Sequence, residues 1–118
     1  MPAHETINYV EFPSNDLAAT KAFFEAVFGW SFTDYGPDYT AFTDPVLEGG
    51  FFKADLCSTT ANGGALVVLY SERLEETLAK VEAAGGTIVR PIISFPGGRR
   101  FQFTEPAGNE LGVWSDRD

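Results

Sequence analysis

The sequence contains a single cysteine, Cys57, and no run approaching about 20 apolar residues. One cysteine cannot form an intramolecular disulfide, which agrees with a reducing compartment, and we interpret Cys57 as an ordinary small residue. A membrane-spanning helix is not expected, and the start MPAHETINYV has neither the basic nor the apolar part of a secretion signal. We therefore expect a cytoplasmic protein with no membrane partner.

Basic residues are also scarce. The chain has eight Lys and Arg residues and 17 Asp and Glu residues, which give a net charge of −9. Such a chain repels phosphate backbones, so nucleic acid is not an expected partner, whereas a cationic ligand would be attracted. Acidity that only keeps the protein in solution is the simpler explanation.

What the sequence does contain is an internal repeat. Its 118 residues suit one domain, spanning 1–118. FTDP at 42–45 returns as FTEP at 103–106, and residues 16–32 align with 73–89, pairing Leu17 with Leu74 and Gly29 with Gly86. Both aligned segments have the apolar spacing of an amphipathic helix. We predict Asp16 and Ser71 as their N-caps, and Gly29 and the pair Gly85-Gly86 as their ends.

Each predicted helix lies among strand-like runs. One run precedes each helix, at 7–12 and 65–70, and three follow it, at 30–35, 39–43 and 49–54 and at 87–92, 99–104 and 110–115. FTDP and FTEP thus close the third strand of two equivalent units. The sequence predicts an α+β fold of two βαβββ modules, module one at about 5–56 and module two at about 63–116.

With this organisation, the chain resembles the vicinal oxygen chelate superfamily, which includes glyoxalase I, extradiol dioxygenases and bleomycin resistance proteins. The resemblance rests on the paired modules and on FFEAVFGWSF, VEAAGGTIVRP and FTEPAGNELGVW. It implies that the strands curl into a mixed sheet enclosing a cleft, with the helices on the outer face. Because small relatives commonly pair modules across chains, it also implies a homodimer.

The resemblance further implies where a divalent metal would bind. In metal-dependent relatives the ligands stand on the first and fourth strands of each module, at positions that correspond here to Tyr9, Gly50, Leu66 and Gly112. None of these is a His, Gln or carboxylate, and tyrosine ligates poorly at neutral pH because its pKa is about 10. A lone histidine, His4, which we expect on the surface, cannot replace the set. We therefore predict neither a metal nor another cofactor.

Three acids lie two residues from those positions, at Glu11, Glu48 and Glu110. That separation places them on the same strand faces, displaced by about 6 to 7 Å. For Glu48 and Glu110 the ordinary interpretation is a solvated carboxylate at the rim of the cleft. Glu11 stands mid-strand on the face that the family turns toward the cleft, so it is a candidate ligand contact and a weak candidate general base.

Aromatic residues make up 14% of the chain. Alternation along strands places Phe52 and Trp114 on the same face as Tyr9, although packing in the core remains an alternative. The predicted ligand-binding set is Tyr9, Glu11, Glu48, Phe52, Leu66, Val68, Glu110 and Trp114. Arg99 and Arg100 are either exposed residues after a glycine turn or a grip for an anionic group, and their role stays open.

Two functions are compatible with these residues. One is a metal-free protein that binds an aromatic or cationic small molecule in the cleft, as bleomycin resistance proteins do. The alternative is a lyase or isomerase resembling glyoxalase I, or a dioxygenase-like enzyme, with non-standard site residues such as Glu11. The sequence does not decide whether the protein is an enzyme, because one fold carries many chemistries.

Overall fold

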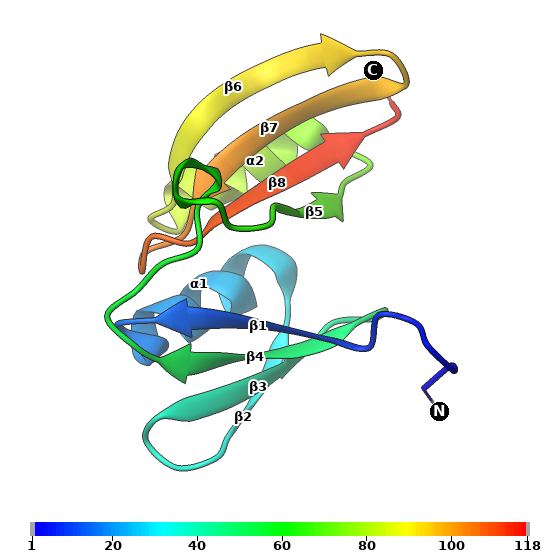
Figure 1. Ribbon diagram of the computed structural model, residues 1–118. Helices are drawn as coiled ribbons and strands as arrows, with labels where there is room; N and C mark the ends of the chain where they lie inside the picture. Colours follow the sequence, from blue (N-terminus) through cyan, green and yellow to red (C-terminus); the bar gives the residue numbers. More distant parts are fainter. Residues whose placement is uncertain (1, 118) are drawn as a thin grey trace.

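A computed structural model describes residues 2–117, which form two successive strand-helix-strand-strand-strand units (Figure 1). Module one contains β1 (Tyr9–Ser14), α1 (Leu17–Phe28), β2 (Ser31–Asp34), β3 (Tyr39–Thr43) and β4 (Glu48–Lys53). A short 3-10 helix, η1 (Thr60–Asn62), lies in the connection. Module two contains β5 (Val67–Tyr70), α2 (Leu74–Ala83), β6 (Thr87–Phe95), β7 (Gly98–Thr104) and β8 (Glu110–Ser115). The predicted α+β fold of paired βαβββ units is confirmed.

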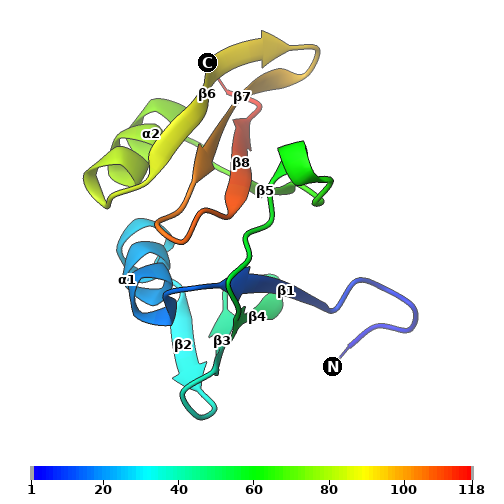
Figure 2. The same ribbon diagram turned by 60° about the vertical axis from the view of Figure 1, so that its left-hand side comes forward.

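Each module builds its own four-stranded mixed sheet. The strand orders are β1-β4-β3-β2 and β5-β8-β7-β6, and in each sheet the first strand pairs in parallel with the fourth. Within residues 2–117 no hydrogen-bonded strand pair joins the two sheets, which are not closed on each other (Figure 2). The edges of β1 and β5 are therefore left without a strand partner in the single chain.

The limits of β1 differ from the sequence prediction, which ended this strand before Pro13. In the structure β1 runs on through Pro13 to Ser14, with Pro13 opposite Phe52 on β4. A proline lacks the backbone N–H that a central strand must donate, but an edge strand tolerates it. The predicted end at residue 12 was wrong because the sequence alone does not show that β1 lies at the edge of the sheet.

The helix signals of module one are confirmed, and one signal of module two is wrong. The Asp16 carboxylate accepts a hydrogen bond from the backbone N–H of Ala19 at 3.1 Å, and Gly29 ends α1 with a left-handed φ of 71°. In module two the N-cap is Arg73, with no side-chain cap. The Ser71 hydroxyl instead accepts from the Arg73 N–H at 3.0 Å and shares a hydrogen bond with Thr77, because the chain turns two residues later than predicted.

The two modules share one aromatic-rich core. Phe23 and Phe24 of α1 are buried, as are Phe101 and Phe103 of β7, and the rings of Phe23 and Phe103 lie 5.7 Å apart across the module boundary. Burying a phenylalanine side chain contributes about 1.5 to 3 kcal/mol. Much of the aromatic content therefore holds the modules together. No helix in residues 2–117 is long and apolar enough to span a membrane.

Buried polar contacts also cross the boundary between the modules. The Asn109 side chain donates to the Pro13 carbonyl at 2.7 Å and to the Glu105 carboxylate at 3.2 Å, and it accepts from the Ser58 N–H at 2.8 Å. Glu105 also accepts from the Thr20 hydroxyl of α1 at 3.1 Å. Burial raises the pKa of the Glu105 carboxyl. The segment FTEPAGN thus fixes the end of β1 and helix α1 against module two.

Candidate functional site

The sheet of module one has a face that no helix covers. Val10 and Phe12 pack toward the core, so the alternate residues Tyr9 and Glu11 point to the opposite side of β1. On β4, Phe51 is fully buried whereas Phe52 is 36% exposed. We call this surface the open face of module one; its residues are Tyr9, Glu11, Tyr39, Glu48, Gly50 and Phe52. The strand phase predicted for Tyr9, Glu11 and Phe52 is confirmed.

Three polar side chains of the open face of module one form a hydrogen-bonded chain. The hydroxyls of Tyr9 and Tyr39 lie 2.6 Å apart, and the Tyr39 hydroxyl donates to the Glu11 carboxylate at 2.9 Å. Burial and the hydrogen bonds to Tyr9 and Glu11 raise the pKa of Tyr39 well above its ordinary value. The Tyr39 phenol therefore keeps its proton at neutral pH and links the other two groups.

The same tyrosines occupy the space that a metal ligand on β4 would need. A Cβ atom added to Gly50 would lie 2.0 Å from the Tyr39 hydroxyl oxygen and 2.9 Å from that of Tyr9. In module two, a Cβ added to Gly112 would meet the Leu66 side chain at 3.5 Å. Within residues 2–117 no three His, Cys, Asp or Glu side chains converge on one point. These residues do not fit the divalent metal of the metal-dependent relatives.

Module two has a matching open face, whose residues are Leu66, Val68, Tyr70, Arg100, Gln102, Gly112 and Trp114. Val67 and Leu69 pack on the core, which turns Val68 and Tyr70 outward, and these two are 41% and 47% exposed. The Trp114 ring stands edge-on to Tyr70 with centroids 5.3 Å apart. This face is therefore aromatic and apolar near β5 and β8.

Glu110 differs from its sequence prediction. We expected a solvated rim carboxylate, but the residue is buried and its oxygens are already engaged. They accept from the Thr60 N–H at 2.8 Å, the Thr60 hydroxyl at 2.9 Å and the Gln102 amide at 2.6 Å. The Thr60 N–H contributes most to a lowered pKa of Glu110. Glu110 thus anchors η1 to β8, whereas Glu48 is exposed as expected.

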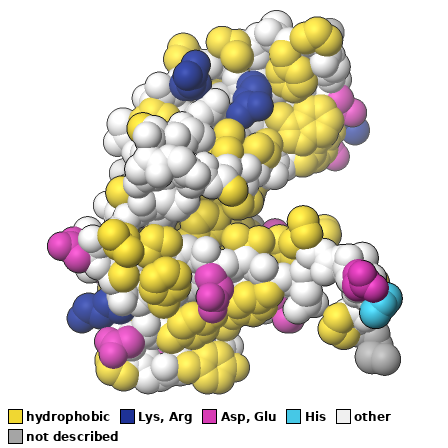
Figure 3. Space-filling view, viewed as in Figure 1, with side chains coloured by type: hydrophobic (Ala, Val, Ile, Leu, Met, Phe, Trp, Pro, Cys, Tyr) yellow, Lys and Arg dark blue, Asp and Glu magenta, His cyan; other side chains and the backbone are white. Residues whose placement is uncertain are grey.

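Arg99 and Arg100 point to opposite sides of β7. Arg99 forms an ion pair with Glu75 of α2 and donates to the Arg117 carbonyl at 3.4 Å. Arg100 lies on the open face of module two, where its guanidinium donates to the Gln102 side chain at 3.3 Å. Only Arg100 is therefore placed to meet a ligand. In Figure 3 basic side chains lie on the viewed surface of module two, and acidic side chains lie on that of module one.

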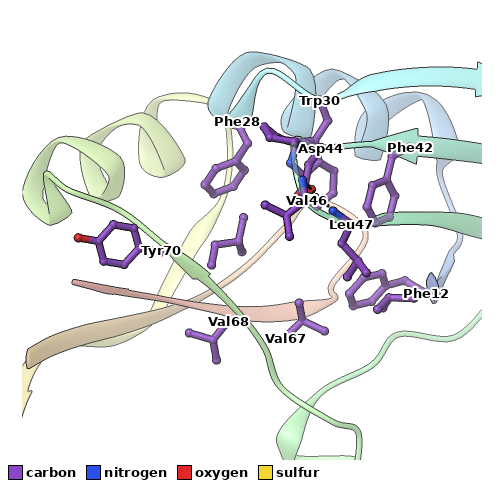
Figure 4. Close-up of a pocket in the computed structure, with 13 residues that line it drawn as sticks. Phe12, Phe28, Trp30, Phe42, Asp44, Val46, Leu47, Val67, Val68 and Tyr70 are labelled. Atoms are coloured by element: carbon purple, nitrogen blue, oxygen red, sulfur yellow. Dashed lines mark hydrogen bonds between the residues drawn. The ribbon is translucent and has the colours of Figure 1, made fainter. Parts of the chain in front are cut away.

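A groove of about 500 Å³ lies between the modules, bounded by β1 and β5 (Figure 4). Phe12, Phe28 and Trp30 line it from module one, and Val67 to Tyr70 line it from module two. The turn at 44–47 also lines the groove, and in this turn the Asp44 carboxylate accepts from the backbone N–H groups of Val46 and Leu47. Val46 is 93% exposed beside this groove. The groove is thus an apolar surface along both free strand edges.

The structure brings together only part of the predicted site. Tyr9, Glu11, Glu48 and Phe52 share one face, whereas Leu66, Val68 and Trp114 lie on the other module. That the two faces line one shared concavity stays a prediction. The sequence analysis did not include Tyr39 in the site. Tyr39 lies on β3, opposite Phe52 of β4. The alternation in YTAFT did not decide which face of the sheet the Tyr39 side chain occupies. The register of β3 against β4 shows that Tyr39 reaches Glu11.

Comparisons with known proteins agree with this architecture. The family model of the glyoxalase/bleomycin resistance protein/dioxygenase superfamily matches residues 6–113. CFP32 of Mycobacterium tuberculosis (strain CDC 1551 / Oshkosh), provisionally named a glyoxylase, is 24% identical over 129 residues, which cover 92% of this chain and 45% of CFP32. The chain therefore spans about half the length of the curated relatives it matches.

Solved structures give the same fold. The fosfomycin resistance protein FosX of Listeria monocytogenes has a TM-score of 0.77 at 18% identity, with 96% of this chain and 94% of FosX covered. A lactoylglutathione lyase from Agrobacterium tumefaciens has a TM-score of 0.71 at 20% identity, with 94% and 93% covered. At such identities the likeness shows the fold alone.

Proposed function

Because the chain belongs to the glyoxalase/bleomycin resistance protein/dioxygenase superfamily, we propose that it binds an aromatic or cationic small molecule without a metal ion. The observation that carries this proposal is the Tyr39 hydroxyl, 2.0 Å from where a Cβ of residue 50 would stand. A phenol thus fills the space from which a metal ligand would project. In this proposal, hydrogen-bonding and aromatic groups of the open faces contact the ligand in place of a metal ion.

The open face of module one suits such a ligand. Tyr9 and Phe52 present exposed rings, and Glu11 and Glu48 present exposed carboxylates. A pocket of about 360 Å³ brings Tyr9 and Glu48 together on this face. Planar ligands stack on such rings, and cations are attracted both by the ring faces and by carboxylates.

A second copy of the chain would complete this site. The open face of module one carries acidic residues, whereas that of module two carries Arg100 and the apolar residues Val68, Tyr70 and Trp114. The two surfaces are complementary in charge, and a two-fold dimer would bring each module one against a module two of its partner. The unpaired edges of β1 and β5 and the apolar groove between them are further surfaces that association would cover.

Ligand screening by thermal shift and calorimetry tests the proposed function. Aromatic amines and amidines should raise the melting temperature by mass action, and manganese or zinc salts should neither raise it nor be required. Glu11→Gln should weaken cationic ligands, and Trp114→Ala should weaken aromatic ligands in general. Glu25→Gln, an exposed carboxylate on α1, is the matched control and should change neither.

Stoichiometric tight binding of a divalent metal, or ligand binding that depends on such a metal, would contradict this function. So would aromatic and cationic ligands whose affinities are the same in Glu11→Gln, Trp114→Ala and the control. The first result would overturn the metal-free part of the proposal, and the second would show that the open faces are not the binding surface.

The alternative, an enzyme acting as a lyase or isomerase, is favoured by one observation. Glu11 is an exposed carboxylate joined through Tyr39 to Tyr9, so it could act as a general base with the two phenols conducting the proton. Formation of lactoylglutathione by the purified chain, abolished in Glu11→Gln, would support this function. No formation of lactoylglutathione by either protein would contradict this particular reaction.

A further inference from the structure

The direction of each hydrogen bond in the Tyr9–Tyr39–Glu11 chain follows from chemistry. An ionised carboxylate has no proton to give, so the single hydroxyl proton of Tyr39 is donated to Glu11 Oε2. At the 2.6 Å contact with Tyr9, the Tyr39 oxygen must then accept and the Tyr9 hydroxyl must donate. The chain of donors runs from Tyr9 through Tyr39 to Glu11.

This direction determines what the cluster offers to a ligand. The Tyr9 proton is engaged, so the Tyr9 oxygen has only lone pairs left, and Glu11 Oε1 likewise only accepts. Glu48, on the same face, adds another carboxylate beside Tyr9. The nearest basic residue along β4, Lys53, has the opposite strand parity to Phe52 and lies outside this face. Within one chain, the Tyr9–Tyr39–Glu11 cluster therefore presents acceptors and negative charge.

We propose that Tyr39 is a positioning residue that makes this cluster a site for a protonated amine or amidinium group of the ligand. This inference rests on the proposed function and narrows its ligand class. The N–H groups of such a cation would donate to the Tyr9 oxygen and to Glu11, while an attached ring would lie against Phe52, which is opposite Tyr39 in the sheet. Carboxylates and phosphates would be repelled.

The test compares three ligands of one shape, namely benzamidine, benzamide and benzoate, by calorimetry on the full chain. Benzamidine should bind at least about tenfold more tightly than benzamide, because hydrogen bonds to charged groups are the stronger ones, and benzoate should bind most weakly. Tyr39→Phe frees the Tyr9 proton and releases Glu11, so benzamidine affinity should fall about tenfold while benzamide affinity stays the same.

The control is Glu25→Gln, which removes an exposed carboxylate on α1, away from the open face of module one, and it should leave all three affinities unchanged. An NMR pH titration of labelled tyrosine gives a readout without ligand. Tyr39 should resist ionisation in the wild type and ionise at lower pH in Glu11→Gln.

Three outcomes separate the hypotheses. Equal affinities for benzamidine and benzoate, or an unchanged benzamidine affinity in Tyr39→Phe, would overturn the inference while leaving a small-molecule site in place. Binding of none of the three ligands would overturn both the inference and the proposed function. The inference is supported if the wild type and the control bind benzamidine more tightly than benzamide and benzoate, and if Tyr39→Phe and Glu11→Gln lose this preference.

Discussion

Replacing Asn109 with alanine should destabilise the contact between the two modules. The side chain is fully buried and makes three hydrogen bonds, to the Pro13 carbonyl, the Glu105 carboxylate and the Ser58 N–H. Alanine leaves all three buried partners without this neighbour. At about 1 kcal/mol for each bond, the free energy of unfolding should fall by about 3 kcal/mol.

That loss converts into a large change in melting temperature. For a chain of 118 residues, the entropy of unfolding is about 0.25 kcal/mol/K, so 3 kcal/mol corresponds to about 12 °C. Calorimetry and urea denaturation measure the change, with Asn8→Ala, an exposed asparagine, as the control that should shift by less than about 2 °C. A loss below about 1 kcal/mol in Asn109→Ala would refute the reasoning, because the three bonds would then contribute little to module packing.

Further predictions concern the sheet, the pH dependence and the assembly. Gly50→Ala should destabilise the wild type by about 1 to 3 kcal/mol but be nearly neutral in a Tyr39→Ala background, since the new Cβ conflicts with the Tyr39 hydroxyl; equal losses in both backgrounds would contradict this. Because burial raises the pKa of Glu105, the folded chain holds this proton more tightly than the unfolded chain. The stabilisation is full below the ordinary glutamate range and is lost as pH rises through the raised pKa. Chemical denaturation at several pH values should show this loss in the wild type and not in Glu105→Gln. Val46→Glu should convert a dimer to a monomer in light scattering, whereas Ala18→Glu on the exposed side of α1 should not; a wild type that stays monomeric at all concentrations would refute the dimer.

The sequence by itself determined the local elements and their repetition. Apolar spacing, the Asp16 cap and Gly29 defined α1, and the return of FTDP as FTEP showed that one unit occurs twice. Strand alternation also gave the correct faces for Tyr9, Glu11 and Phe52. These features depend on residues close together in the chain, so their physical causes are visible in a linear pattern.

Only the tertiary structure decided which of these residues meet. The register of β3 against β4 carries Tyr39 over Gly50 and into contact with Glu11, 28 residues earlier in the chain. The packing of η1 on β8 buries Glu110, which its sequence neighbours did not indicate. Such contacts join distant segments, and their geometry depends on sheet register and module packing. The sequence could therefore predict the faces of the site, whereas the hydrogen-bonded cluster that gives one face its chemistry required the fold.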